Sequence, residues 1–82
     1  MNIHVFTVIE ESYRHGDLNG STKKLFKHEE LRDEYYEFLI KFYKNELQLV
    51  DQGDGDFSDN YNWAYSVKKG KEDLEIIEER NW

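Results

Sequence analysis

The chain has 82 residues, no cysteine, a net charge of −7 and an aromatic content of 16%. This length predicts one domain spanning residues 1–82, and the lack of cysteine excludes disulfides and thiolate metal sites. With 11 basic and 18 acidic residues, the chain is not expected to contact nucleic acid directly. Because no apolar run approaches the roughly 18 residues of a membrane span, and the first residues lack the basic start of a signal peptide, we expect a cytoplasmic protein that does not enter a membrane.

The first predicted element is a strand in "IHVFTVIEES", residues 3–12. Both of its faces are largely apolar, and β-branched residues dominate. This pattern is typical of a central strand that is at least partly covered on both sides. The turn-forming residues of "YRHGDLNGST" follow, and residues 22–26 are then expected to pair back on the first strand as a hairpin.

The best helical pattern covers about residues 28–47. At 100° per residue, its apolar side chains form a stripe that is expected to pack on one face of the sheet. The residues of this predicted core stripe are Leu31, Tyr35, Phe38, Leu39 and Phe42.

Three more residues of this helix, Tyr36, Ile40 and Tyr43, widen the apolar sector to roughly 200°, whereas about 100° suffices for one sheet face. Something else is therefore expected to cover them. One alternative is the C-terminal segment, residues 74–82, which offers Ile77 and Trp82. The other is a second chain or a binding partner, and under it the three residues are predicted contact residues.

The remaining elements follow from local patterns. Residues 47–50 could begin a strand, the aspartate-rich stretch after them is interpreted as a loop, and residues 63–67 alternate as a strand. "KKGKED" is predicted to turn at Gly70, and residues 74–82 favour a strand over a helix. The predicted fold class is α+β: a small antiparallel sheet of 3–4 strands with one long amphipathic helix packed on one face.

The aspartate-rich stretch, "DQGDGDFSDNYNW", raises the question of a calcium site. An EF-hand loop needs oxygen ligands at positions 1, 3, 5 and 12 and glycine at position 6. Counted from Asp54, Asp59 falls on the glycine position and Tyr65 on that of the bidentate glutamate. We therefore predict no metal and no other cofactor, with a weak, non-standard calcium site as the alternative. The plain interpretation of these residues is turn geometry.

Catalytic patterns are weak. The serines lack a G-x-S-x-G setting, and the three histidines show no paired metal-ligand spacing. "RHGD", residues 14–17, gathers a cation, an imidazole and a carboxylate, which could perform acid–base chemistry or form a polar turn. We therefore predict that the protein is not an enzyme.

The acidic residues concentrate in the C-terminal part, because residues 47–82 hold nine acids and four bases. We predict a non-enzymatic protein-binding domain whose partner has a basic surface, with homodimer formation as a further expectation. The alternative is a phage-type acidic inhibitor of a nucleic-acid-binding protein, which is similar to some anti-CRISPR proteins in size and charge but shares no motif with them. The predicted contact residues are Tyr36, Ile40, Tyr43, Asp51, Asp54, Asp56 and Asp59.

Overall fold

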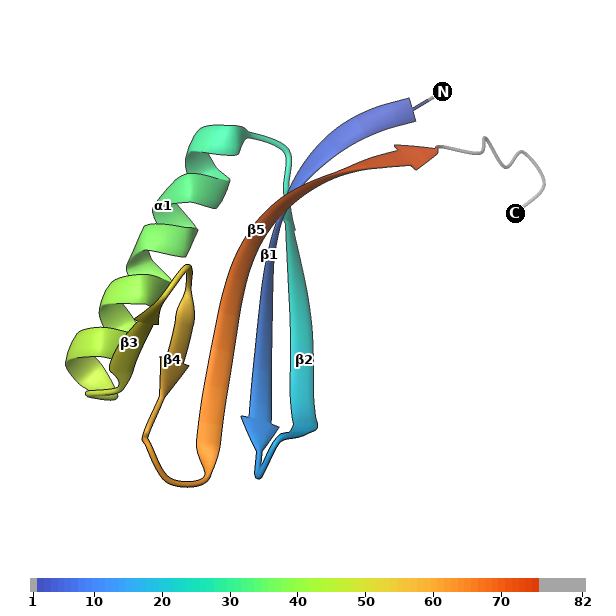
Figure 1. Ribbon diagram of the computed structural model, residues 1–82. Helices are drawn as coiled ribbons and strands as arrows, with labels where there is room; N and C mark the ends of the chain where they lie inside the picture. The colour runs from blue at the N-terminus through green and yellow to red at the C-terminus, as the bar shows by residue number, and fades with distance from the viewer. Residues whose placement is uncertain (1, 76–82) are drawn as a thin grey trace.

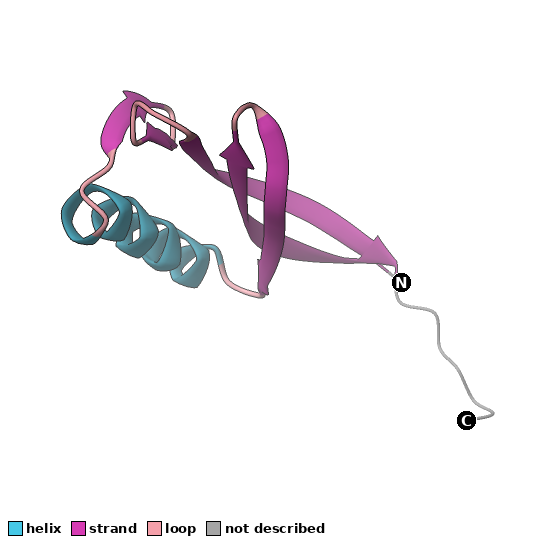
Figure 2. Ribbon diagram, turned by 90° about the horizontal axis from the view of Figure 1, so that it is seen from below, coloured by secondary structure: helices cyan, strands magenta, loops and turns pink. Residues whose placement is uncertain are grey.

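The computed structural model describes residues 2–75. One antiparallel sheet has the strand order β2-β1-β5-β4-β3, and a helix lies against one of its faces (Figures 1 and 2). The elements are β1 (Asn2–Arg14), β2 (Asp17–Phe26), α1 (Glu29–Lys41), the π-helical turn η1 (Phe42–Glu46), β3 (Val50–Gly53), β4 (Asp56–Ser58) and β5 (Trp63–Glu75). The α+β class is confirmed, but the expected number of 3–4 strands is too low, because the sheet has five.

The strand pair β3–β4 lies largely in the stretch that was expected to be a loop, although a strand was expected to begin within residues 47–50 and β3 does begin at Val50. Asp54 and Gly55 both have a positive φ, 55° and 80°, which suits the two-residue turn of a tight hairpin between β3 and β4. A Cβ atom at Gly55 would lie 2.1 Å from the carbonyl oxygen of Val67, so only glycine fits here. The Val67 amide donates to the Gly55 carbonyl oxygen at 2.8 Å, which ties this turn to β5.

β1 and β5 form the centre of the sheet. They pair without a register shift from Asn2 opposite Glu75 to Arg14 opposite Trp63. The predicted turn at Gly70 is therefore wrong: β5 passes straight through this residue. Glycine is needed there for space, since a Cβ atom would lie 2.7 Å from Oγ1 of Thr7 on the neighbouring strand.

The ends of β1 and β5 reach beyond the rest of the sheet. β2 pairs with β1 only as far as Phe6 opposite Phe26, so the first residues of β1 have β5 alone as a neighbour. In Figure 1 this two-stranded ribbon bends away from the body of the sheet. The prediction for residues 74–82 is tested only at its start, where β5 ends at Glu75; residues 76–82, with Ile77 and Trp82, lie outside the described residues.

The hydrophobic core lies between the sheet and α1. Alternation along the strands directs one set of side chains toward the helix, and the helix contributes its own buried residues. The core residues are Val8, Leu39, Tyr43, Phe57 and Val67. Between residues 2 and 75, no helix has the length and apolar character that crossing a membrane requires.

α1 is rotated relative to the predicted core stripe. The residues that face the sheet are centred on Arg32, Leu39 and Tyr43, which are all buried. Leu31, Phe38 and Phe42 were expected in the core and are instead exposed, so that part of the prediction is wrong. At 100° per residue, the buried side is displaced by roughly 80° from the expected one.

Polar contacts explain this rotation. The Arg32 guanidinium lies 5.2 Å from the centre of the Phe6 ring, and it donates to the carbonyl oxygen of Gly70 and to Asp33. The hydroxyl group of Tyr43 donates to Glu10 at 2.6 Å. These side chains can be buried because their polar ends are satisfied, whereas the apolar pattern alone gives no sign that an arginine belongs in the core.

Candidate functional site

The four aspartates of the predicted contact set have local structural roles. Asp59 accepts hydrogen bonds at 2.8–3.0 Å from the backbone N–H groups of Tyr61, Asn62 and Trp63. These bonds favour the charged carboxylate, so they lower the pKa of Asp59 below its ordinary value. Asp59 therefore closes the turn that leads into β5.

The other three aspartates belong to the β3–β4 hairpin. Asp56 pairs with Lys68 at 3.0 Å. Asp51 accepts a hydrogen bond from the Gly53 amide at 2.8 Å, and Asp54 occupies the turn itself. Across residues 2–75, no group of three or more histidine, aspartate or glutamate side chains could hold a metal ion. Turn formation and pairing with lysine account for these aspartates.

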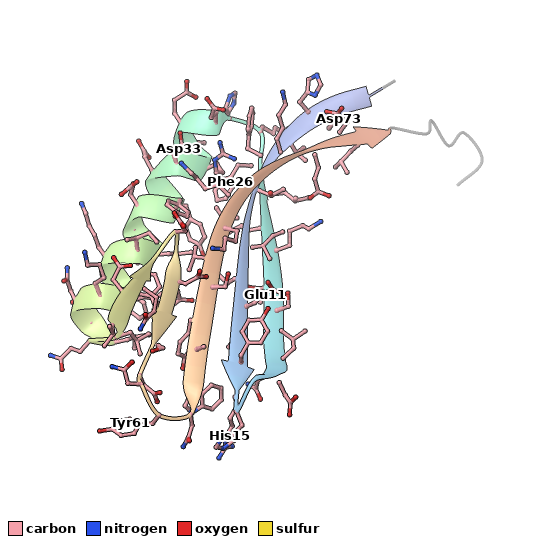
Figure 3. The ribbon with its side chains drawn as sticks, in the orientation of Figure 1. Glu11, His15, Phe26, Asp33, Tyr61 and Asp73 are labelled. Atoms are coloured by element: carbon pink, nitrogen blue, oxygen red, sulfur yellow. The ribbon has the colours of Figure 1, made fainter. Side chains whose placement is uncertain are left out.

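The "RHGD" segment forms the turn between β1 and β2. Arg14 lies over the Trp63 ring at 5.5 Å, and the His15 amide donates to the carbonyl oxygen of Asn62 at 2.8 Å. These contacts join the β1–β2 turn to the turn that precedes β5, and Figure 3 shows His15 and Tyr61 at this same end of the sheet. The contacts of this segment are those expected of a polar turn.

The second part of the predicted contact set packs within the domain. Tyr43 is only 8% exposed, and Tyr36 and Ile40 are half-buried against the core. The amino group of Lys69 lies 4.9 Å from the centre of the Tyr36 ring and covers it further. The sheet itself thus covers these three residues, and their role in partner binding stays a prediction.

The apolar surface that α1 leaves uncovered is on its other side. Leu31 is 51% exposed, Phe38 59% and Phe42 36%. The rings of Phe38 and Phe42 are stacked with their centres 6.2 Å apart, and Tyr35 stacks on Phe38 at 6.4 Å. We call Leu31 and Phe38 of α1, together with Phe42 of η1, the aromatic ridge. The stacked rings of Tyr35, Phe38 and Phe42 hold one another in place.

Acidic residues flank the aromatic ridge. Shallow hollows lie beside Phe38, lined by Glu34, Glu37 and Lys41 on one part and by Lys41, Phe42 and Glu46 on the next. Within the described residues, Glu34, Glu37 and Glu46 form no ion pair. Lys41, which lines both hollows, also forms no ion pair within the described residues, so the rim is predominantly acidic, with three unpaired glutamates against one lysine. The apolar pattern of the sequence gave no sign of this rim.

The sheet face opposite α1 is also partly apolar. Lys23 and Glu72 form an ion pair at 2.7 Å across Thr7, which is buried. This face is therefore covered in part by its own long side chains, and within residues 2–75 by no second layer. Its exposed apolar residues are Ile3, Leu18, Leu25 and Leu74.

A third feature lies where the end of the helix meets the hairpin of β1 and β2. There, the half-buried Glu10 accepts hydrogen bonds from the hydroxyl groups of Tyr43 at 2.6 Å and Tyr35 at 3.4 Å. Burial raises the pKa of both tyrosines, and the neighbouring Glu10 carboxylate raises it further. A hollow of about 260 Å³ opens beside Glu10. The sequence signal for this site was Glu10 itself, a glutamate that follows Phe6 and Val8 on the same face of a predicted central strand.

Comparisons with protein-family models, with curated proteins and with solved structures find no match to this chain.

Proposed function

We propose that this chain is a non-enzymatic protein-binding domain that uses the aromatic ridge of α1 to hold a segment of a partner protein with apolar and basic side chains. The observation that carries this proposal is the exposure of Phe38, 59%, in a ring stack with Phe42. A phenylalanine placed at the centre of an acidic helix surface costs solubility unless another surface covers it.

The ridge has the size of an interface anchor. A phenylalanine side chain offers roughly 200 Å² of surface, so Phe38, which is 59% exposed, leaves about 120 Å² available to a partner. At about 25 cal/mol per Å², covering this residue alone is worth about 3 kcal/mol. Leu31 and Phe42 extend the patch along one side of the helix. Few residues carry most of the binding energy in protein interfaces, and aromatic anchors are typical among them.

Charge indicates the kind of partner. Glu34, Glu37 and Glu46 border the ridge without ion pairs among the described residues, so lysine or arginine beside the apolar anchors of a partner would find matching charge. A second copy of the chain would bring the same three glutamates to this face with only Lys41 to offset them, so like charges would on balance repel. We therefore propose a different protein as the partner at this face, in place of the homodimer that was one expectation.

The charge-mimic alternative has less support. It relied on the acidic residues of the C-terminal part, which are the aspartates of residues 51–59 and the acids of residues 72–79. Among these, Asp56 already pairs with Lys68, Glu72 pairs with Lys23, and Asp59 is bound by three backbone N–H groups. A row of charge for a basic groove would need these carboxylates free and evenly spaced. The acidic rim of α1 is short and surrounds an apolar centre, which suits a peptide segment better than a phosphate-binding groove.

A peptide-display selection tests the proposal. Random 12-residue peptides would be selected on the immobilised protein, and the dissociation constants of enriched peptides measured by calorimetry. Enriched peptides should combine apolar residues with lysine or arginine, and affinity should fall with salt because exposed charges are screened. Phe38→Ala with Phe42→Ala should weaken binding at least 30-fold, roughly 2 kcal/mol.

The matched control removes apolar residues from the opposite face. Leu18→Ala with Leu25→Ala deletes two exposed residues of β2 and should leave the dissociation constant within about threefold. Peptides without basic residues, or peptides that bind the Phe38 and Phe42 double variant as well as the wild type, would overturn the proposal.

A further inference from the structure

The Glu10 carboxylate is half-buried and has no cationic partner among residues 2–75. Its hydrogen bonds come from two neutral phenols, those of Tyr43 and Tyr35. The basic residue nearest on this face of β2 is Lys24, and its amino group lies over the Tyr35 ring at 4.5 Å. A carboxylate that is partly removed from water is usually paired, so the missing positive charge indicates a ligand.

The hollow beside Glu10 has the chemistry of a cation site. It measures about 260 Å³, and the rings of Tyr43 and Tyr65 line it with their centres 5.7 Å apart. Ser12 and Thr22 add hydroxyl groups to the lining. Aromatic faces attract cations, and hydroxyl groups accept additional hydrogen bonds from a donor-rich ligand.

We propose that this hollow, the Glu10 pocket, binds a guanidinium group. Guanidinium is planar, carries five N–H donors when attached to a chain, stacks on aromatic rings and pairs with both oxygens of a carboxylate. Glu10 supplies the carboxylate, the half-buried Tyr65 the more accessible aromatic ring, and Ser12 and Thr22 the hydroxyl groups. An ammonium group is more strongly hydrated and cannot stack, so it should bind less well.

The pocket adjoins the aromatic ridge. Phe42 of the ridge contacts Tyr43 of the pocket with ring centres 6.0 Å apart, and Tyr35 contacts both Phe38 and Glu10. An arginine of the partner segment could therefore enter the pocket while apolar neighbours cover the ridge. The arginine source rests on the proposed function, whereas a free guanidinium compound as ligand does not.

NMR titration with methylguanidinium chloride at constant ionic strength tests the pocket. Signals of Tyr43 and Tyr65 should shift and saturate with a dissociation constant of about 1–10 mM, as expected for a fragment of this size. Urea, which has a similar planar shape and no charge, should produce no saturable shift. Methylammonium should bind at least fivefold more weakly. Equal shifts with urea, equal affinity for methylammonium, or no saturation with methylguanidinium would overturn the inference on the wild-type protein alone.

Two variants with the same change in net charge locate the site. Glu10→Gln keeps the shape and should weaken methylguanidinium binding at least tenfold. Glu34→Gln, on the outer side of α1, should leave it within twofold. Unchanged binding in the folded Glu10→Gln protein would contradict the assignment.

A third arm separates this inference from the proposed function. Phe38→Ala with Phe42→Ala should weaken binding of a selected peptide at least 30-fold, while methylguanidinium should still bind. Replacing arginine by citrulline in that peptide should weaken its binding if arginine is the source of the guanidinium group. A peptide that loses no affinity with citrulline, while methylguanidinium still binds, would overturn the arginine source and leave a small molecule as the ligand.

Discussion

Two neighbouring residues of α1 should differ sharply in their effect on stability. Leu39 is 6% exposed and belongs to the core cluster, so Leu39→Ala removes buried methyl groups and leaves a cavity. Such substitutions in protein cores cost about 2–5 kcal/mol of unfolding free energy. In a domain this small, a loss of that size is a large part of the total stability.

Phe38→Ala should cost much less, although it removes more atoms. The side chain is 59% exposed, so roughly 80 Å² of a total near 200 Å² is buried, which corresponds to about 2 kcal/mol. This is an upper limit, because the unfolded chain covers part of that area and no closed cavity forms. Alanine also recovers about 0.5 kcal/mol of helix propensity. The net cost should be about 1 kcal/mol.

Urea unfolding followed by circular dichroism measures both variants. With a slope near 1 kcal/mol per M for a small domain, Leu39→Ala should lower the midpoint by at least 2 M and Phe38→Ala by about 1 M. A cost for Phe38→Ala as large as that for Leu39→Ala would mean that Phe38 faces the sheet, as the apolar pattern alone predicted, and that the aromatic ridge does not exist.

Three further predictions concern single positions. Gly55→Ala should lower the free energy of unfolding by more than about 3 kcal/mol, because the new Cβ atom would overlap the carbonyl oxygen of Val67. Gly53→Ala places its Cβ atom in open space and should lower it only by the roughly 1–2 kcal/mol that a positive φ costs. Urea unfolding compares the two variants. Tyr43→Phe should reduce the loss of stability that occurs above about pH 10. Burial and the hydrogen bond to Glu10 raise the pKa of Tyr43 in the folded state. The stabilisation that Tyr43 contributes is therefore complete below the pKa of tyrosine in the unfolded chain and is lost as the pH rises above that pKa; urea unfolding at several pH values measures it. Asp59→Asn should reduce the loss of stability in acid, because hydrogen bonds from backbone N–H groups lower the pKa of Asp59 in the folded state. The stabilisation that the Asp59 carboxylate contributes is present above the ordinary pKa of 3.8 and is lost as the pH falls below it. Unfolding midpoints measured between pH 2 and pH 7 test this.

Local patterns predicted the elements that carry a single dominant signal. The β-branched first strand, the long helix and the strand that begins at Trp63 are all present, and so is the antiparallel α+β arrangement. A strand beginning within residues 47–50 was predicted, but β4 was not, even though the Asp54–Gly55 pair is a strong hairpin signal. The strands β3 and β4 are only four and three residues long, so the alternation of apolar residues around the turn was too short to recognise.

The orientation of α1 could not be predicted from apolar spacing. An apolar sector roughly 200° wide is about twice as wide as one sheet face can cover, so either half of it could pack on the sheet. Which half does so depends on contacts between residues far apart in the chain. Arg32 is buried through Phe6 and the carbonyl oxygen of Gly70, which is 38 positions away in the chain. The turn predicted at Gly70 was wrong for a similar reason. Glycine is present there because its small size leaves room for Thr7 on the neighbouring strand, and this contact is known only from the pairing of β1 with β5.

Photo-crosslinking at the aromatic ridge would show whether this surface binds a separate protein in the cell. A benzoylphenylalanine residue would be placed at Phe38, and as a control at Leu25 on the opposite face, in cells that express the protein naturally. We predict that the Phe38 position crosslinks to one distinct protein through a segment that contains basic residues, and that the Leu25 position does not. A crosslink from Phe38 to residues of the same chain, or no crosslink beyond that of the Leu25 control, would contradict the account.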